Sequence, residues 1–322
     1  MSSNKLMIML LCIFVTCPLT AATRSQEEQK ADLIIESVYH NQEIDKVLSM
    51  PVRLEKISHL FLKKPYFLGA LGEGISGQYD QFPLYRVDAF DCLTFVETVL
   101  ALAEGDSLHS FQHFIKKIRY QDGRVSFITR NHFTDLDWNL NNQRNGFLKD
   151  VTATIHNEHQ QSVAKIAEAL INKSSWYQHL SKNRIRLVGS DPSEQMKRLK
   201  ALKAEGQALL PQKVAIPYIP FSALFDHHAK PNQYLFHQIP EGAIVEIVRP
   251  NWNLSKVIGT NMNVSHLGFA FWRGEELMFR NASTLKGFVV DQPLIDYLRV
   301  ALLESPTIQG INIQIVKRPP EV

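Results

Sequence analysis

One cysteine stands apart from the rest of this chain. Of the three cysteines among 322 residues, Cys12 and Cys17 lie in an apolar N-terminal segment, and only Cys92 follows it. Cys92 comes after Asp91 at the start of an apolar stretch, in the sequence Asp88-Ala-Phe-Asp-Cys-Leu-Thr-Phe-Val-Glu97. A thiol with no internal partner is inert core, an intermolecular link or a nucleophile. A helix start lowers the pKa of a thiol and favours the nucleophile, although cysteine is also among the most buried residue types.

A nucleophilic cysteine requires a base and a group that orients the base. The chain has 12 histidines, so histidine content alone identifies no base. His266 differs in context, because it lies in a predicted strand and is followed by Gly268. A hairpin brings Asn281 back beside His266, where its amide oxygen would accept the far imidazole N–H, as in a Cys-His-Asn set. A core histidine and a strand-end asparagine are the structural alternatives.

The elements that must position these residues change character along the chain. Helices are predicted over 26–62 (broken by Pro51), 92–104 (ended by Gly105), 107–118 and 160–180, with an ordered loop at 63–90 and a polar, aromatic loop at 129–149. Strands are predicted over 243–248, 264–272, 276–281 and 311–316, with a hairpin turn at 273–276. Helices first and an antiparallel sheet after them indicate an α+β fold. Because 92–104 is apolar almost all round, Cys92 opens a buried central helix.

The first 22 residues are typical of a secretory signal peptide. Lys5 precedes the apolar run 6–19, and small residues follow it up to Ala22. The pattern predicts export to the periplasm. Thr16 is a poor residue before a lipid-modified cysteine, so an anchor at Cys17 is disfavoured.

The mature chain, 23–322, is predicted to be a single elaborated domain in which the charged segment 181–212 is an insertion or a surface helix. No segment after the leader reaches the roughly 18 uninterrupted apolar residues of a membrane span. The net charge is only +3, and no long basic run appears, so the sequence gives no reason to expect nucleic acid as a partner. It contains no metal motif such as His-Glu-x-x-His and predicts neither a metal nor another cofactor. The oligomeric state is left open.

Several segments together resemble the NlpC-type papain-like cysteine amidases of bacterial cell walls, and within them the N-acetylmuramoyl-L-alanine amidase-like branch, once a domain of unknown function. The most specific of them is 88–97, around Cys92. The others are Val264-Ser-His-Leu-Gly-Phe269 and Arg280-Asn-Ala-Ser283, together with Pro65-Tyr66, Gly72-Glu-Gly74, Pro83-Leu-Tyr-Arg86, Arg130-Asn-His132 and Pro240-Glu-Gly242.

This resemblance implies a papain-like α+β core with Cys92 as nucleophile and His266 as general base. Relatives in the branch commonly have histidine where Asn281 stands, in a His-Ala-Ser pattern, so Asn281 departs from the family in type while keeping the ability to accept the hydrogen bond. The implied reaction is hydrolysis of the amide between (anhydro-)N-acetylmuramic acid and the L-alanine of the stem peptide. Peptidoglycan or its fragments would be the substrate.

Secondary site residues are predicted with structural alternatives beside them. Tyr85 and Ser265 are candidate donors to the oxyanion, together with the backbone N–H of Cys92. Arg130, Asn131 and His132 form a candidate sugar-binding loop, or they only hold a surface loop together.

Glu97 lies in a mostly apolar helix and is predicted to pair with a cation such as Arg86 for structural reasons. Two other functions remain open at this point. One is a γ-D-glutamyl-diaminopimelate endopeptidase with the same catalytic residues. The other is a non-catalytic periplasmic binding protein with a buried thiol.

Overall fold

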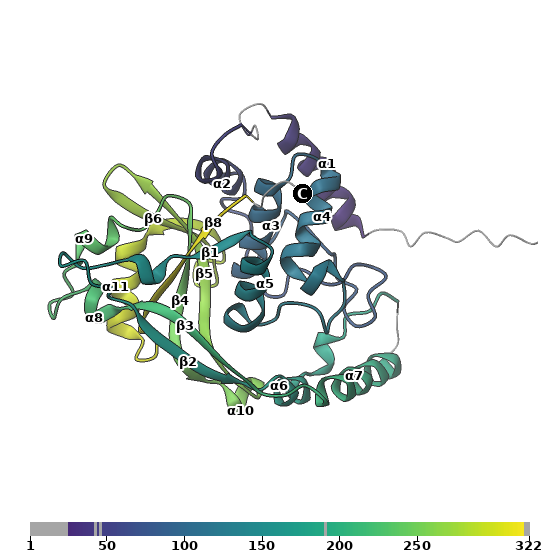
Figure 1. Ribbon diagram of the computed structural model, residues 1–322. Coiled ribbons are helices and arrows are strands. Elements are labelled where there is room, and N and C mark those ends of the chain that lie inside the picture. The colour runs from purple at the N-terminus through teal and green to yellow at the C-terminus, as the bar shows by residue number, and fades with distance from the viewer. Residues whose placement is uncertain (1–24, 42–43, 45–46, 190–191, 319–322) are drawn as a thin grey trace, which may run out of the picture.

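The computed structural model describes residues 25–318 apart from 42–43, 45–46 and 190–191 (Figure 1). The predicted signal peptide, with Cys12 and Cys17, lies outside the described residues. Within the described part of the chain, no helix is both long and apolar enough to cross a membrane.

The fold is α+β and is built on an eight-stranded sheet in which every strand pair is antiparallel. Seven strands follow the order β2-β3-β8-β4-β5-β6-β7, and β1 pairs with β8. The strands are β1 Leu148–Asp150, β2 Lys165–Ile171, β3 Gln212–Pro220, β4 Ala243–Asn253, β5 Asn261–Arg273, β6 Glu276–Ser283, β7 Phe288–Pro293 and β8 Gly310–Val316. The predicted antiparallel sheet is therefore confirmed.

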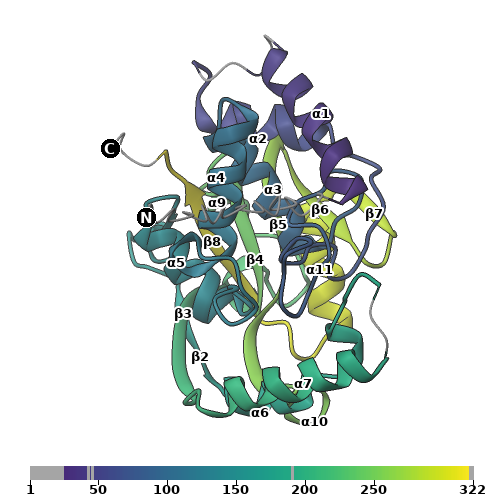
Figure 2. The ribbon, with the colours of Figure 1, turned by 90° about the vertical axis from the view of Figure 1, so that its right-hand side faces the viewer.

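Helices cover both faces of this sheet (Figure 1). On one side lie α1 Gln26–His40, α2 Met50–His59, α3 Cys92–Glu104, α4 Leu108–Arg119 and α5 Asn139–Arg144, and on the other lie α8 Phe221–Leu224, α9 Gln233–Phe236 and α11 Leu294–Glu304. The turned view shows α6 Lys173–His179, α7 Pro192–Gln207 and α10 Ser255–Ile258 along one end of the molecule, opposite α1 and α2 (Figure 2).

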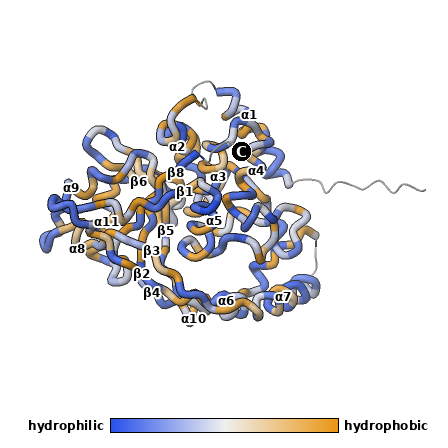
Figure 3. Tube along the Cα trace, in the orientation of Figure 1, coloured by the Kyte–Doolittle hydropathy of each residue, from blue (hydrophilic) through white to orange (hydrophobic). Residues whose placement is uncertain are grey.

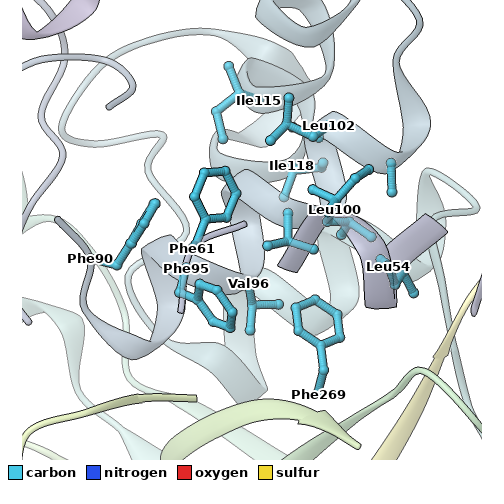
Figure 4. Close-up of a cluster of buried hydrophobic side chains, with 14 of the residues drawn as sticks. Leu54, Phe61, Phe90, Phe95, Val96, Leu100, Leu102, Ile115, Ile118 and Phe269 are labelled. Atoms are coloured by element: carbon cyan, nitrogen blue, oxygen red, sulfur yellow. The ribbon is translucent and has the colours of Figure 1, made fainter. Parts of the chain in front are cut away.

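The central helix α3 is buried against the sheet, as its sequence predicts. Phe95, Val96 and Leu100 are fully buried, and Phe95 makes an edge contact with Phe269 of β5, with ring centroids 5.9 Å apart (Figure 4). Each such side chain contributes roughly 1.5–3 kcal/mol by leaving water. This packing fixes the axis of α3 relative to β5 and so fixes where Cys92 and His266 stand.

The helix predicted over 160–180 is wrong in its first half. Residues 165–171 form β2, and Ala167, Ala169 and Ile171 are buried while their neighbours are exposed. That alternation has the period of a strand, and pairing with β3 uses it. The strands β3 and β7 and the helix α11 were not predicted from the sequence. The segment 129–149, predicted as a loop, contains a π-helical turn, Thr134–Trp138, followed by α5.

The segment 181–212 was predicted as an insertion or a surface helix. Its described residues contain a short 3-10 turn at Lys182–Arg184 and the mostly hydrophilic helix α7 (Figure 3). Pro192 is the first residue of α7, where its fixed φ and missing N–H are tolerated. Gly206 packs directly on the ring of Tyr177 in α6, where a Cβ would lie 2.1 Å from the ring. Helix α7 is therefore packed closely on α6.

Candidate active site

Cys92 is the first residue of α3, and its position is set by Asp91. The Asp91 Oδ1 accepts the backbone N–H of Thr94 at 2.8 Å, and the Thr94 hydroxyl accepts the backbone N–H of Asp91 at 2.9 Å. This capping box satisfies amides that the helix start leaves unpaired. The second carboxylate oxygen of Asp91 accepts the N–H of Gly69 at 2.8 Å, so the same side chain ties the preceding loop to the helix.

The Cys92 thiol is partly exposed but lies in an environment that disfavours its charged form. Burial raises the pKa of Cys92 to about 12, the Asp91 carboxylate adds to the rise, and the backbone amides of Leu267 and Leu93 oppose it. The sequence-based expectation that the helix start lowers this pKa is therefore wrong in its net direction, because desolvation and one neighbouring charge outweigh the helix amides.

His266 and Asn281 are brought together as the hairpin predicts. The Nε2 of His266 lies 3.0 Å from the Asn281 Oδ1, and the Asn281 Nδ2 donates to the backbone oxygen of Phe279 at 3.2 Å. Since that donation orients the amide, its oxygen faces His266 and selects the tautomer with the proton on Nε2. The Nδ1 of His266 is then the nitrogen free to accept a proton. Asn281 is completely buried, which keeps this bond away from water.

The backbone next to His266 contacts the thiol. The amide of Leu267 forms a hydrogen bond that favours the Cys92 thiolate, which places the thiol beside the segment 266–267 of β5. Burial lowers the pKa of His266, and the Asn281 bond and the Asp91 charge oppose that shift. Both shifts favour a neutral thiol beside a neutral imidazole, so His266 is in the protonation state of a base.

Gly268 explains how Asn281 reaches across the strands. The paired part of β5 and β6 includes Phe269↔Arg280, which places Gly268 opposite Asn281. A Cβ on Gly268 would lie 2.8 Å from the Asn281 Cβ and 2.5 Å from the Arg280 oxygen. Without that Cβ, the Asn281 side chain has room to extend diagonally to His266, two residues away on the same face of β5.

Two tyrosines near the thiol were missed as site residues. The ring of Tyr297, from α11, lies 6.3 Å from the His266 ring, and burial together with the nearby Cys92 raises the Tyr297 pKa to about 12. Burial also raises the pKa of Tyr66, with Cys92 and Asp91 adding to the rise. Both tyrosines therefore carry neutral hydroxyls around Cys92. Tyr66 lies in a segment of the family resemblance, but α11 itself was not predicted, so no sequence signal pointed to Tyr297.

A family model described as N-acetylmuramoyl-L-alanine amidase-like, or AmiA-like, matches residues 56–303, which include Cys92, His266 and Asn281. The chain belongs to this amidase-like family. A crystal structure of a Legionella pneumophila protein of the family DUF1460 superposes with a TM-score of 0.87 and 53% identity, covering 90% of this chain and 95% of that one.

More distant structures share the fold of this amidase-like protein. An N-acetylmuramoyl-L-alanine amidase from Bacteroides uniformis is similar with a TM-score of 0.55 and 26% identity, over 82% of this chain and 98% of its own. A putative xylanase from Bacteroides fragilis is similar with a TM-score of 0.53 and 24% identity, over 80% and 98%. No curated protein sequence matches the chain.

Among the secondary residues of this amidase-like protein, Ser265 lies beside His266 on β5. Its Oγ accepts a hydrogen bond from the Arg249 Nε at 3.1 Å. Tyr85 lies elsewhere: its hydroxyl donates to Asp32 at 2.6 Å and accepts from Gln112 at 2.7 Å. Tyr85 therefore joins α1 to α4 and is not placed as an oxyanion donor.

The loop predicted to bind sugar is held by bonds inside the protein. The Arg130 Nη1 pairs with Asp80 at 2.9 Å, and the Asn131 amide donates to the Ile118 oxygen at 3.1 Å. His132 bonds the Phe127 oxygen at 2.7 Å, and burial holds its pKa well below the usual range. Arg130 and Asn131 also line a polar pocket whose lining includes neither Cys92 nor His266.

Glu97 pairs with Arg119 at 2.5 Å, so the predicted partner Arg86 is wrong. Arg86 instead forms two bonds with Asp88, at 2.6 and 2.7 Å. The sequence predicted a cation as the partner of Glu97, but only the antiparallel packing of α4 on α3 shows that the cation is Arg119. Within the described residues, no group of three or more His, Cys, Asp or Glu side chains is arranged to hold a metal ion.

Proposed function

We propose that this protein is an exported cysteine amidase that hydrolyses the bond between N-acetylmuramic acid, including its anhydro form, and the L-alanine of the stem peptide. One observation carries the proposal: a buried amide holds the Nε2 of His266, while the backbone beside His266 contacts the thiol at the start of α3. Together with membership of the amidase-like family, this arrangement supports Cys92, His266 and Asn281 as nucleophile, base and orienting group. The core would then be papain-like, within one elaborated domain.

The neutral resting pair determines the order of events. As the Cys92 sulfur attacks the lactyl carbonyl carbon, its proton passes to the Nδ1 of His266. The C–N bond then breaks, and the imidazolium gives this proton to the departing amine of L-alanine. A water attacks the thioester, loses a proton to His266, and the thiol is regenerated when that proton returns to sulfur. The Asn281 oxygen stabilises the imidazolium in both steps.

The oxyanion formed in the reaction needs hydrogen-bond donors on the side of the thiol away from His266. The backbone N–H of Cys92 at the helix start is one. The hydroxyl of Tyr66 takes the second role in this proposal, in place of Tyr85, because Tyr66 lies near Cys92 and keeps its proton.

A pocket on the Tyr66 side suits the sugar. Its lining includes Tyr66, Phe67 and Phe82, and the last two rings are stacked with centroids 6.1 Å apart. Aromatic faces with nearby polar groups are suited to pyranose rings, which have apolar faces and hydroxyl edges. The sugar would then lie on the Tyr66 side of the thiol and the leaving peptide on the His266 side.

Digestion of a purified disaccharide–peptide muropeptide tests the proposal. The wild-type chain should release a free peptide beginning with L-alanine and a peptide-free sugar, both identified by mass, and Cys92→Ala should release neither. A sugar that keeps L-Ala-D-Glu would show the γ-D-glutamyl endopeptidase instead. Muropeptide bound but recovered intact from wild-type protein would show a binding protein.

A further inference from the structure

Arg249, on β4, is a partly exposed cation beside the catalytic histidine that the proposed reaction does not use. Its Nε donates to the Ser265 Oγ at 3.1 Å, its Nη1 donates to the Thr307 hydroxyl at 2.6 Å, and its guanidinium lies 4.3 Å from the centre of the Trp252 ring. Among the residues that the structure describes, Arg249 forms no ion pair with a carboxylate. The side chain is thus held rigidly by neutral groups while its charge is left unpaired.

The backbone around Arg249 is shaped to aim this side chain. The β4–β5 register shifts between Val248 and Trp252, and Asn251 has a positive φ of 51°. Such bulges re-aim side chains and are frequent next to active sites. A non-glycine residue in the left-handed region costs of order 1 kcal/mol, which the surrounding bonds must offset. One of these is the bond from the Asn251 N–H to the Asn263 Oδ1, at 2.9 Å.

Tyr297 connects Arg249 with the thiol. The Arg249 charge lowers the pKa of Tyr297 while the nearby Cys92 raises it, so the phenol lies close to both. Tyr297 also lies against His266. The Tyr297 phenol therefore stands between the Cys92 thiol and the Arg249 guanidinium, on the His266 side of the thiol. In the proposed reaction this is the side of the leaving amine.

We propose that Arg249 binds a carboxylate of the stem peptide, and that the α-carboxylate of the D-glutamate in the second position is the group it selects. The inference rests on the proposed function, which sets the direction of the substrate. From the scissile nitrogen, two residues of extended peptide span about 7 Å. The D-glutamate carboxylate is the first carboxylate along that path, and a guanidinium can bind it through two parallel hydrogen bonds.

Binding of two product peptides tests this without requiring turnover. L-Ala-D-Glu and L-Ala-D-isoglutamine differ only in that the second has an amide where the first has the α-carboxylate. In the full-length Cys92→Ala background, calorimetry should show that L-Ala-D-Glu binds about 10- to 100-fold more tightly, as expected for a charge-assisted hydrogen-bonded pair. Adding Arg249→Gln should bring this ratio close to one.

The matched control is Arg273→Gln. Arg273 is an exposed arginine of the same sheet, paired with Glu55 at 2.5 Å, and its replacement should leave the ratio unchanged. The inference is overturned if Arg249→Gln keeps the preference, or if the background protein shows no preference, including no binding of either peptide. If Arg249 had a purely structural role, Arg249→Gln would weaken the binding of both peptides equally, and that result would also overturn the inference.

Cleavage by the Cys92-containing protein separates this inference from the proposed function. Peptide binding with an Arg249-dependent preference, but no release of peptide from the muropeptide, would reject the amidase and keep the subsite. Release of peptide at equal kcat/KM from muropeptides with D-glutamate and D-isoglutamine would keep the amidase and reject the subsite.

Discussion

On the Cys92 side of the site, charged side chains lock together loops that have little regular structure. Asp80 accepts bonds from both Arg130 and Arg186, and Arg186 also donates to the Gly69 oxygen at 2.6 Å, next to the bond between Gly69 and Asp91. On the His266 side, paired strands hold the imidazole, and the amide of Asn281 orients it. Cys92 is thus placed by ion pairs between segments distant in sequence, and His266 by local sheet register.

Because of this contrast, substitutions on the two sides should have different effects. Removing a side chain on the His266 side should lower activity but leave the sheet intact. Removing a charge on the Cys92 side leaves buried partners unpaired and costs folding free energy.

The largest effect is expected from His266→Ala. Loss of the proposed general base should lower kcat/KM for muropeptide cleavage about 10³-fold, within the range for acid–base groups, while the melting temperature changes little because β5 keeps its pairing. His237→Ala, at an exposed histidine near Glu275, is the control and should retain full activity. A His266→Ala variant that keeps a tenth of wild-type kcat/KM would show that the base lies elsewhere.

The next largest effect is expected from Asp80→Ala, as a loss of stability. Asp80 is buried, and its removal leaves Arg130 and Arg186 without their shared carboxylate, so the free energy of unfolding should fall by about 3–5 kcal/mol in a denaturant titration. Asp122→Ala, which breaks an exposed pair with Arg124, should cost less than about 1 kcal/mol. Equal losses for the two variants would contradict the contrast between the sides.

Arg130 and Arg186 also determine how the contribution of Asp80 to stability changes with pH. Burial alone would raise the pKa of Asp80, but Arg130 and Arg186 outweigh it, so the pKa is lowered on folding. The contribution of Asp80 is therefore fully present above the unfolded pKa of about 3.9 and is lost as the pH falls through the folded value.

A smaller loss of activity is expected from substitutions that break the hydrogen bond between Asn281 and His266. Asn281→Ala removes a hydrogen bond to the imidazolium, and Gly268→Ala should displace the same amide, so each should lower kcat about 10- to 100-fold. Asn281→Asp is the informative partner variant. It keeps an acceptor, and its charge favours the imidazolium, so the acid limb of its pH–rate profile should move to higher pH. Unchanged profiles in all three variants would remove Asn281 from the mechanism.

The arrangement on the His266 side could be predicted better from the sequence than that on the Cys92 side. Strand alternation and a hairpin turn are local signals, and they were enough to bring Asn281 to His266. The Cys92 side depends on contacts between distant segments, such as the pair of Glu97 with Arg119 and the anchoring of Gly69 by Arg186. Local patterns contain no information about such partners.

The direction of the Cys92 pKa shift likewise could not be predicted from local sequence patterns. The helix start at Asp91 was visible in the sequence, and the structure confirms it. The degree of burial of the thiol was not visible, because it depends on how β5 packs on α3, and burial decides the sign of the shift.

The pH profile of the wild-type protein should show the lowered pKa of His266. An imidazolium accepts no proton from the thiol, so kcat/KM should fall on the acid side, with a midpoint below the ordinary value of about 6.5 because burial disfavours the charged ring. Measurement of muropeptide cleavage between about pH 4 and 8 gives this midpoint. A midpoint above 6.5 would contradict the lowered pKa of His266.

The smallest effect is expected from Asp91→Asn, which separates the cap of α3 from its charge. The asparagine oxygen still caps the helix by accepting the Thr94 N–H, so the fold should be retained, whereas Asp91→Ala should cost about 1 kcal/mol. Because the Asp91 charge raises the pKa of Cys92, its loss should speed iodoacetamide labelling of Cys92 about threefold to tenfold at pH 8. Asp88→Asn is the control, since the Asp88 charge is paired with Arg86 and is not among the main causes of the raised Cys92 pKa. Equal labelling rates in Asp91→Asn and wild type would leave burial as the sole cause of the raised pKa.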